Sequence, residues 1–150
     1  MKLIIITVFL FSTISCKQEV PEEAIAKEIV SLTKEYNGAW DKLNMENVAK
    51  FHSDSSFRYY RYGALAVSNN EEFRKMAPMW MEGIKNLEAV EFSDPVVQVL
   101  SENAAIISFK GVAKVVLKNG NEELESNTAT YVWQKRNNEW KIVHIHESKK

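Results

Sequence analysis

The chain is poor in the residues that build covalent, metal and phosphate sites. It contains one cysteine, three histidines, five glycines and three prolines in 150 residues. A single thiol cannot form an intrachain disulfide, and no Gly-rich phosphate loop, nucleophile elbow or zinc-binding spacing is present. The formal net charge of −1, with scattered Lys and Arg, excludes a broad basic surface. We therefore expect no cofactor, no metal and no nucleic-acid partner.

Long apolar runs are also lacking, with one exception at the start of the chain. Residues 3–11 are almost wholly apolar and follow Lys2, but this run is too short to span a bilayer as a helix. A charged start, an apolar middle and small residues after it are typical of an export signal. The sequence therefore predicts an exported protein.

The only cysteine lies at the end of this signal. Ser15 directly before Cys16, with Ile14 before that, resembles the lipobox of bacterial lipoproteins, although Thr13 stands where that pattern prefers leucine. Acylation of Cys16 would explain an unpaired thiol in an exported protein. We expect a lipoprotein anchored through Cys16 in a membrane of the bacterial cell envelope. A plain secretory signal with an incidental cysteine is the alternative.

These features divide the chain into three parts. We predict a lipoprotein signal peptide over residues 1–15, a polar tether over residues 16–21 and one domain over residues 22–148. A content of 45% hydrophobic and 26% charged residues is ordinary for a soluble globular domain of this length.

Helical periodicity dominates the first half of the domain. Apolar residues at steps of three and four predict amphipathic helices. The expected elements are a helix over residues 22–43, a short helix capped by Asn44, strands over 57–62 and 64–67, and a third helix after the polar cluster 68–70. The apolar face of the third helix extends to Leu87, and Pro78 inside it predicts a kink or a restart.

From residue 88 onward the apolar period changes to two, which indicates strands. The candidate strands cover residues 88–93, 96–100, 104–117, 123–135 and 140–147. Helices first and strands later favour an α+β fold, with the helices on one face of a curved, mainly antiparallel sheet.

Two expected hairpin turns assign the side chains of the last strands to faces. If residues 119–120 and 137–138 are two-residue turns, Tyr131 lies opposite His144. One face then collects, towards its open end, the polar residues Ser108, Lys110, Tyr131, His144 and His146. The other face contains Ile107 and Phe109 and is almost wholly apolar, which suggests a second copy of the chain as partner.

Two segments also carry a family resemblance. They are VAKFHSDSSFRYYRYG (residues 48–63) and TYVWQKRNNEWKIVHIHES (residues 130–148), of which the second is the more specific. The mature chain resembles the nuclear transport factor 2-like superfamily, and within it the SnoaL-like and calmodulin-kinase association-domain branches. The resemblance implies a cone-shaped α+β fold with a curved mixed sheet, three helices on its concave face, a pocket between the two, and a homodimer.

The resemblance also bears on individual residues. In the association-domain branch the pocket carries arginines on the sheet, and the matching positions here hold Lys110, Tyr131 and Glu147, so only Lys110 keeps a positive charge. The fold also hosts ketosteroid isomerases, whose oxyanion-donating tyrosine matches Tyr36 and whose base aspartate is replaced by Tyr60. A tyrosine with a pKa near ~10 is a poor base at neutral pH, so we expect the isomerase machinery to be absent.

These observations predict a semi-polar ligand pocket. Its expected lining is Tyr36, Tyr60, Trp80, Ser108, Lys110, Tyr131, His144 and His146. The two strand histidines could bind a metal, but two ligands are too few, and a role in the pocket wall is favoured. We predict a domain that binds a small molecule or a partner protein without established catalysis. The alternatives are an isomerase, cyclase or hydratase acting on a small carbonyl compound, and a purely structural dimerisation module.

Overall fold

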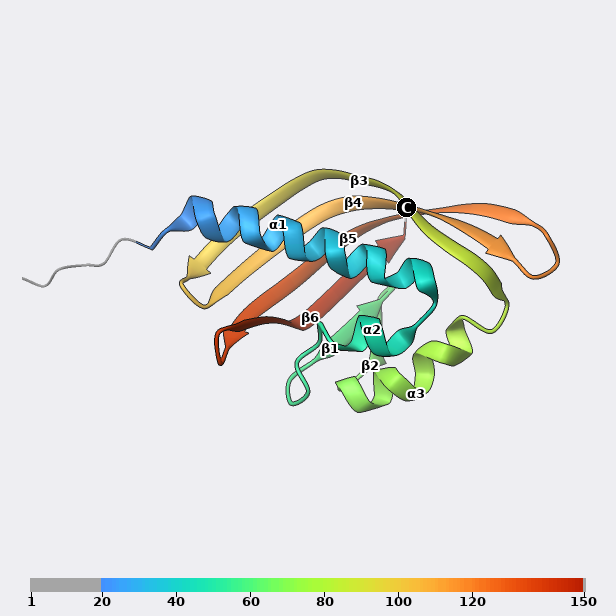
Figure 1. Cartoon of the computed structure of the whole chain (residues 1–150), viewed down its shortest axis with the longest axis horizontal. Coiled ribbons are helices and arrows are strands. Elements are labelled where there is room, and N and C mark those ends of the chain that lie inside the picture. Colours follow the sequence, from blue (N-terminus) through green and yellow to red (C-terminus); the bar gives the residue numbers. More distant parts are fainter. Residues whose placement is uncertain (1–19, 150) are drawn as a thin grey trace, which may run out of the picture.

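The computed structural model describes residues 20–149 and shows helices packed on one sheet (Figure 1). The elements are α1 (Glu22–Ala39), η1 (Trp40–Lys42), α2 (Met45–Ala49), β1 (Arg58–Arg61), β2 (Ala64–Val67), α3 (Asn70–Trp80), β3 (Ile84–Ser101), β4 (Ala104–Leu117), β5 (Glu122–Arg136) and β6 (Glu139–Lys149). The predicted signal peptide and Cys16 lie outside the described residues. None of the described helices is long and apolar enough to cross a membrane.

The six strands form one mixed sheet in the order β2-β1-β6-β5-β4-β3. All neighbours are antiparallel except β1 and β6, which run parallel and are far apart in the sequence. The sheet is curved and not closed, and α1 lies across its concave face, with α2 and α3 beside β1 and β2 (Figure 1). The predicted α+β fold with a curved mixed sheet and three helices is confirmed.

Local sequence explains where the first helices begin and end. The residues of α1 that face the sheet follow at helical spacing and are Ile25, Ile29, Thr33 and Tyr36. The helical stretch then tightens to 3-10 geometry and ends at Leu43, whose φ is 51°. The side chain of Asn44 accepts hydrogen bonds from the backbone N–H groups of Glu46 and Asn47, which confirms the predicted cap of α2.

The third helix is shorter than the sequence predicts. It ends at Trp80, two residues after Pro78, and Ile84 and Leu87 belong to β3 instead. Pro78 removes the helical hydrogen bond to the carbonyl of Arg74 and weakens the last turns of the helix, which ends two residues further on. The helical spacing of Ile84 and Leu87 was therefore a coincidence of pattern.

The predicted break at Asp94-Pro95 is a bulge within one long strand. The pairing of β3 with β4 shifts between Ser93 and Val96, and Asp94 has a φ of 51°. Because β3 is at the edge of the sheet, the missing N–H of Pro95 can face away from the ladder. Asp94-Pro95 therefore interrupts the regular pairing of β3 but does not end the strand.

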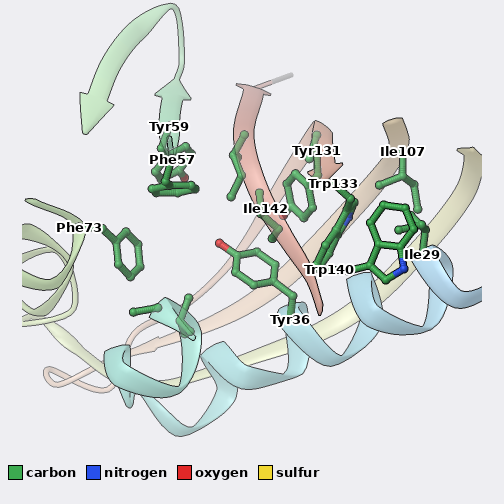
Figure 2. Close-up of a cluster of buried hydrophobic side chains, with 14 of the residues drawn as sticks. Ile29, Tyr36, Phe57, Tyr59, Phe73, Ile107, Tyr131, Trp133, Trp140 and Ile142 are labelled. Carbon is green, nitrogen blue, oxygen red and sulfur yellow. The ribbon is translucent and has the colours of Figure 1, made fainter. Parts of the chain in front are cut away.

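The core lies between α1 and the concave face of the sheet, here called the inner face (Figure 2). Its largest fully buried side chains include Trp133, Tyr36, Phe57, Phe73 and Ile107. Figure 2 shows Tyr36 reaching from α1 towards the sheet residues Tyr131 and Ile142. Each buried aromatic ring removes a large apolar area from water and so contributes strongly to the stability of the core.

The β4–β5 hairpin has a three-residue loop, not the predicted two-residue turn. The backbone N–H of Leu117 donates to the carbonyl of Asn121 at 2.8 Å, and Gly120 closes the loop with a φ of 90°. A three-residue loop that ends in a left-handed residue is a common hairpin connection. The extra loop residue shifts β4 by one position against β5, so Ala105 lies opposite Trp133.

A one-residue shift turns every side chain of a strand to the other face. Ile107 and Phe109, assigned by the two-residue turn to the apolar outer face, are buried on the inner face. Ser108 and Lys110 consequently point to the convex side, here called the outer face. The predicted faces of β4 were therefore wrong.

The last hairpin has the predicted two-residue turn, but β6 contains a bulge. Arg136 pairs with Glu139 as expected. The register then shifts, because Trp133 pairs with Ile142 whereas Val132 pairs with His144. The extra residue is Val143. Beyond this bulge Ile145 and Glu147 face inward while His144 and His146 face outward, so Tyr131 lies opposite Ile145 and the predicted Tyr131–His144 pair was wrong.

Candidate functional site

A pocket of about 390 Å³ lies between the inner face of the sheet and the ends of α1 and α3. Its apolar wall includes Trp40, Trp80, Leu87, Phe109, Ala113 and Val115. Its polar wall includes Asn37, Tyr59, Arg61, Glu125, Asn127 and Glu147. A mostly apolar cavity with a few convergent polar groups is the usual form of a small-molecule site.

Glu147 is the centre of the polar wall. Its side chain is only 14% exposed, and its Oε2 accepts a hydrogen bond from the Tyr59 hydroxyl at 2.6 Å. The Nε of Arg61 lies 3.9 Å from the same oxygen, and the Nη2 of Arg61 lies 3.6 Å from Oε2 of Glu125. The parallel pairing of Arg61 with Glu147 brings these groups together.

Burial sets the protonation of this group of residues. Desolvation raises the pKa of Glu147, and the hydrogen bond from Tyr59 and the charge of Arg61 only partly oppose it. Burial also raises the pKa of Tyr59 and Tyr131 well above the ordinary value, so both hydroxyls remain hydrogen-bond donors. The Tyr131 hydroxyl donates to Oδ1 of Asn37 at 3.3 Å. The pocket thus contains a carboxyl group suited to proton transfer or to pairing with a cation.

Two of the eight predicted pocket residues line this cavity, namely Trp80 and Tyr131. Tyr36 is buried in the core instead. The other five, which lie on the outer face, are Tyr60, Ser108, Lys110, His144 and His146. Ser108, Lys110, His144 and His146 were assigned to the pocket through the wrong register. Tyr60 was assigned through the family resemblance and faces outward because it alternates on β1 with Tyr59 and Arg61.

The outer-face residues have partners of their own. Lys110 forms an ion pair with Asp94 at 2.7 Å, so the one positive charge that the family resemblance placed in the pocket lies outside it. The ring of His144 packs against that of Tyr60, with 5.4 Å between the ring centroids. The part of the chain that the structure describes has no group of three or more His, Cys, Asp or Glu that could hold a metal ion.

Sequence reasoning missed Tyr59, Arg61 and Glu147 as a group. A signal for Glu147 was present in β6, where the apolar alternation changes phase between Ile142 and Val143. Trp140 and Ile142 are buried, and so is Ile145. An alternation that restarts one residue early indicates a bulge, and continuing it places Glu147 inside.

A second buried polar cluster surrounds His52. The amide nitrogen of Asn70 donates to the carbonyl of Ala49 and to Asp54, so its Oδ1 is left as an acceptor, 3.1 Å from Nδ1 of His52. That nitrogen must therefore carry the proton. The Nε2 of His52 then accepts from the Tyr36 hydroxyl at 3.2 Å. Tyr36 is thus committed to the core and is not available as an oxyanion donor in the pocket.

The fold is that of the nuclear transport factor 2-like proteins. A nuclear transport factor 2-like superfamily protein from Salmonella enterica is similar in structure, with a TM-score of 0.77 and 20% identity over 85% of this chain and 92% of that one. A hexachlorocyclohexane dehydrochlorinase (LinA type 2) is also similar, with a TM-score of 0.73 and 13% identity over 85% of this chain and 86% of that one.

The chain belongs to the calcium/calmodulin dependent protein kinase II association domain family, whose profile matches residues 25–150. The calcium/calmodulin-dependent protein kinase type II alpha chain of Drosophila melanogaster is 35% identical over 66 residues. That match covers 43% of this chain but only 12% of the kinase. The sequence match therefore covers only a small part of the kinase.

The pH dependence of stability tests the assignment of His52. Burial, with a smaller contribution from the charge of Arg74, lowers the pKa of His52 from 6.5 to about 3. As the pH falls from about 6.5 towards about 3, His52 therefore becomes protonated in the unfolded chain but stays neutral in the folded chain. The contribution of neutral His52 is fully present above pH 6.5 and is lost across this window.

We expect the contribution of His52 to the free energy of unfolding to fall by about 2 kcal/mol between about pH 6.5 and about pH 4.5. A His52→Gln variant cannot titrate and should show a shallower dependence, with the difference between the two curves close to one proton. Urea unfolding at a series of pH values measures both curves. Parallel curves would contradict the assignment.

Proposed function

We propose that the domain binds a small molecule in the pocket around Glu147. The observation that carries this proposal is the cavity of about 390 Å³, a size within the usual range of ligand sites. A purely structural module would have this space filled by side chains such as Trp80 and Tyr131. Both instead form part of its wall, which supports an open binding site.

An enzyme is the second candidate, because one observation favours it. Catalysis by proton transfer needs a titrating group inside the cavity, and Glu147 is a buried carboxyl group on the pocket wall whose pKa is raised by desolvation. The structural similarity to a dehydrochlorinase supports the idea that such a fold can carry an enzyme.

Filling the pocket tests the binding proposal. An Ala113→Trp variant places an indole against the pocket wall, whereas an Ala64→Trp variant makes the same change on an exposed strand. In ligand-observed NMR with a library of aromatic fragments, the wild type and Ala64→Trp should bind the same fragments, and Ala113→Trp should lose them. A wild-type protein that binds no fragment would contradict the proposal.

The same samples separate a binding module from an enzyme. In deuterated water, bound carbonyl fragments should keep the protons next to their carbonyl if the domain only binds. Exchange of those protons that Glu147→Gln abolishes would support the enzyme instead.

We further propose that the outer face pairs with a second copy of the chain. Large apolar side chains exposed there include Tyr60, Leu65, Val96, Leu100 and Leu124. These side chains are spread across the sheet from β2 to β3, and their exposure on one face, together with membership of an association-domain family, supports self-association.

Two matched charge insertions test this interface. Val96 on the outer face is 67% exposed and Met79 on α3 is 65% exposed. Val96→Arg should convert a dimer into a monomer in sedimentation equilibrium, because a like charge then faces its copy across the interface. Met79→Arg should leave the dimer intact. A wild-type protein that sediments as a monomer would rule out the pairing.

We also propose that Cys16 carries a lipid that anchors the protein in the cell envelope. The proposal rests on the signal-like start of the sequence and on the Ile14-Ser15-Cys16 triplet. A Cys16→Ser variant should remain unprocessed and unlipidated when membrane fractions are analysed by mass spectrometry. A variant that is processed and membrane-bound like the wild type would refute the anchor.

A further inference from the structure

The charges around the pocket are mostly negative. Four glutamates and one arginine line it: Glu91, Glu123, Glu125, Glu147 and Arg61. A cavity lined by charges of one sign and by low-dielectric walls concentrates ligands of the opposite sign. The arginine-lined pocket implied by the family resemblance would attract anions, so this chain has the reverse electrostatic character.

The single cation of the pocket is already engaged. Arg61 lies between Glu125 and Glu147, with N···O distances of 3.6 and 3.9 Å. Its guanidinium also lies over the ring of Tyr62, 4.8 Å from the ring centroid. An anionic ligand that approached Arg61 would therefore meet the repulsion of two neighbouring carboxylates.

The second nearby cation is also engaged. Lys114 pairs with Glu122 at 2.9 Å and is not part of the pocket wall. Together with the outward position of Lys110, this leaves the described wall without a lysine. Arg61 is thus the one positively charged side chain in the described wall, and glutamates flank it.

The apolar wall favours a cation independently of the glutamates. The rings of Trp40, Tyr59, Trp80, Phe109 and Tyr131 all line the cavity. Aromatic faces attract ammonium and guanidinium groups, and the attraction is stronger when water is excluded. The same rings can also hold an apolar ligand body by stacking or edge contacts.

Glu147 is the natural partner of such a ligand. It lies at the buried part of the wall, where the low dielectric strengthens an ion pair and weakens an isolated charge. Because burial disfavours its ionised form, a bound cation would restore the ionised carboxylate and gain interaction energy from it.

We propose that this pocket selects an organic cation, with an ammonium or guanidinium group beside Glu147 and an apolar body against Trp80 and Tyr131. This inference rests on the proposed function and adds the chemical class of the ligand. A small protonated amine that carries an aromatic ring fits both walls.

Three probes that share one skeleton test the charge preference: 3-phenylpropylamine, 3-phenylpropanol and 3-phenylpropionate. Titration calorimetry at low salt and neutral pH should show the amine binding at least about tenfold more tightly than the alcohol, and the carboxylate binding most weakly. Added salt should weaken the binding of the amine and leave the affinity of the alcohol unchanged.

Variants locate the preference. Glu147→Gln should reduce the amine affinity about tenfold, towards that of the alcohol, while the alcohol keeps its affinity. Glu122→Gln removes a carboxylate outside the pocket and should leave all three affinities unchanged. Arg61→Gln should have the opposite effect to Glu147→Gln and increase the affinity for the amine, because Glu125 and Glu147 then lose the positive charge beside them. Thermal unfolding of each variant checks that the fold is retained.

The outcomes separate this inference from the proposed function. Alcohol or carboxylate binding at least as tight as that of the amine would overturn the cation preference and leave the pocket as a binding site. Failure of all three probes, together with no hit in the fragment library, would overturn the binding function itself.

Discussion

The composition of the site depends on one extra residue in β6. The bulge at Val143 changes which side chains of the last strand face the helices. Before the bulge, Trp140 and Ile142 point inward, and after it Ile145 and Glu147 do. Without it, His144 would enter the core in place of Ile145. Burying a branched aliphatic side chain costs less than burying an imidazole, which is a physical reason for the bulge.

The second constraint is the parallel pairing of β1 with β6. These strands are far apart in the sequence, and Tyr59 and Glu147 are 88 residues apart when their side chains meet at 2.6 Å. Tyr59 and Arg61 alternate on β1 and so share the inner face. The pairing places a donor and a cation beside a buried carboxyl group, and the surrounding glutamates make the pocket acidic.

Periodicity predicted the elements well because it reflects local burial. The cap at Asn44, the strand over residues 104–117 and the turn at 137–138 all follow from side-chain chemistry within a few residues. The prediction of which β4 side chains face inward was wrong because Asn119-Gly120 suits both a two-residue and a three-residue loop. That single ambiguity moved Ser108 and Lys110 from the outer face into the predicted pocket.

The sequence by itself determined the order of helices and strands, the α+β class and the family, since these depend on local patterns and on motif identity. Only the tertiary structure decided which residues share the pocket. Loop length and bulge position are chosen by how two strands pack together on one core, and that choice is made between residues distant in the chain. The histidines of β6 therefore lie outside, and Glu147, which the predicted register had placed on the opposite face, lies within.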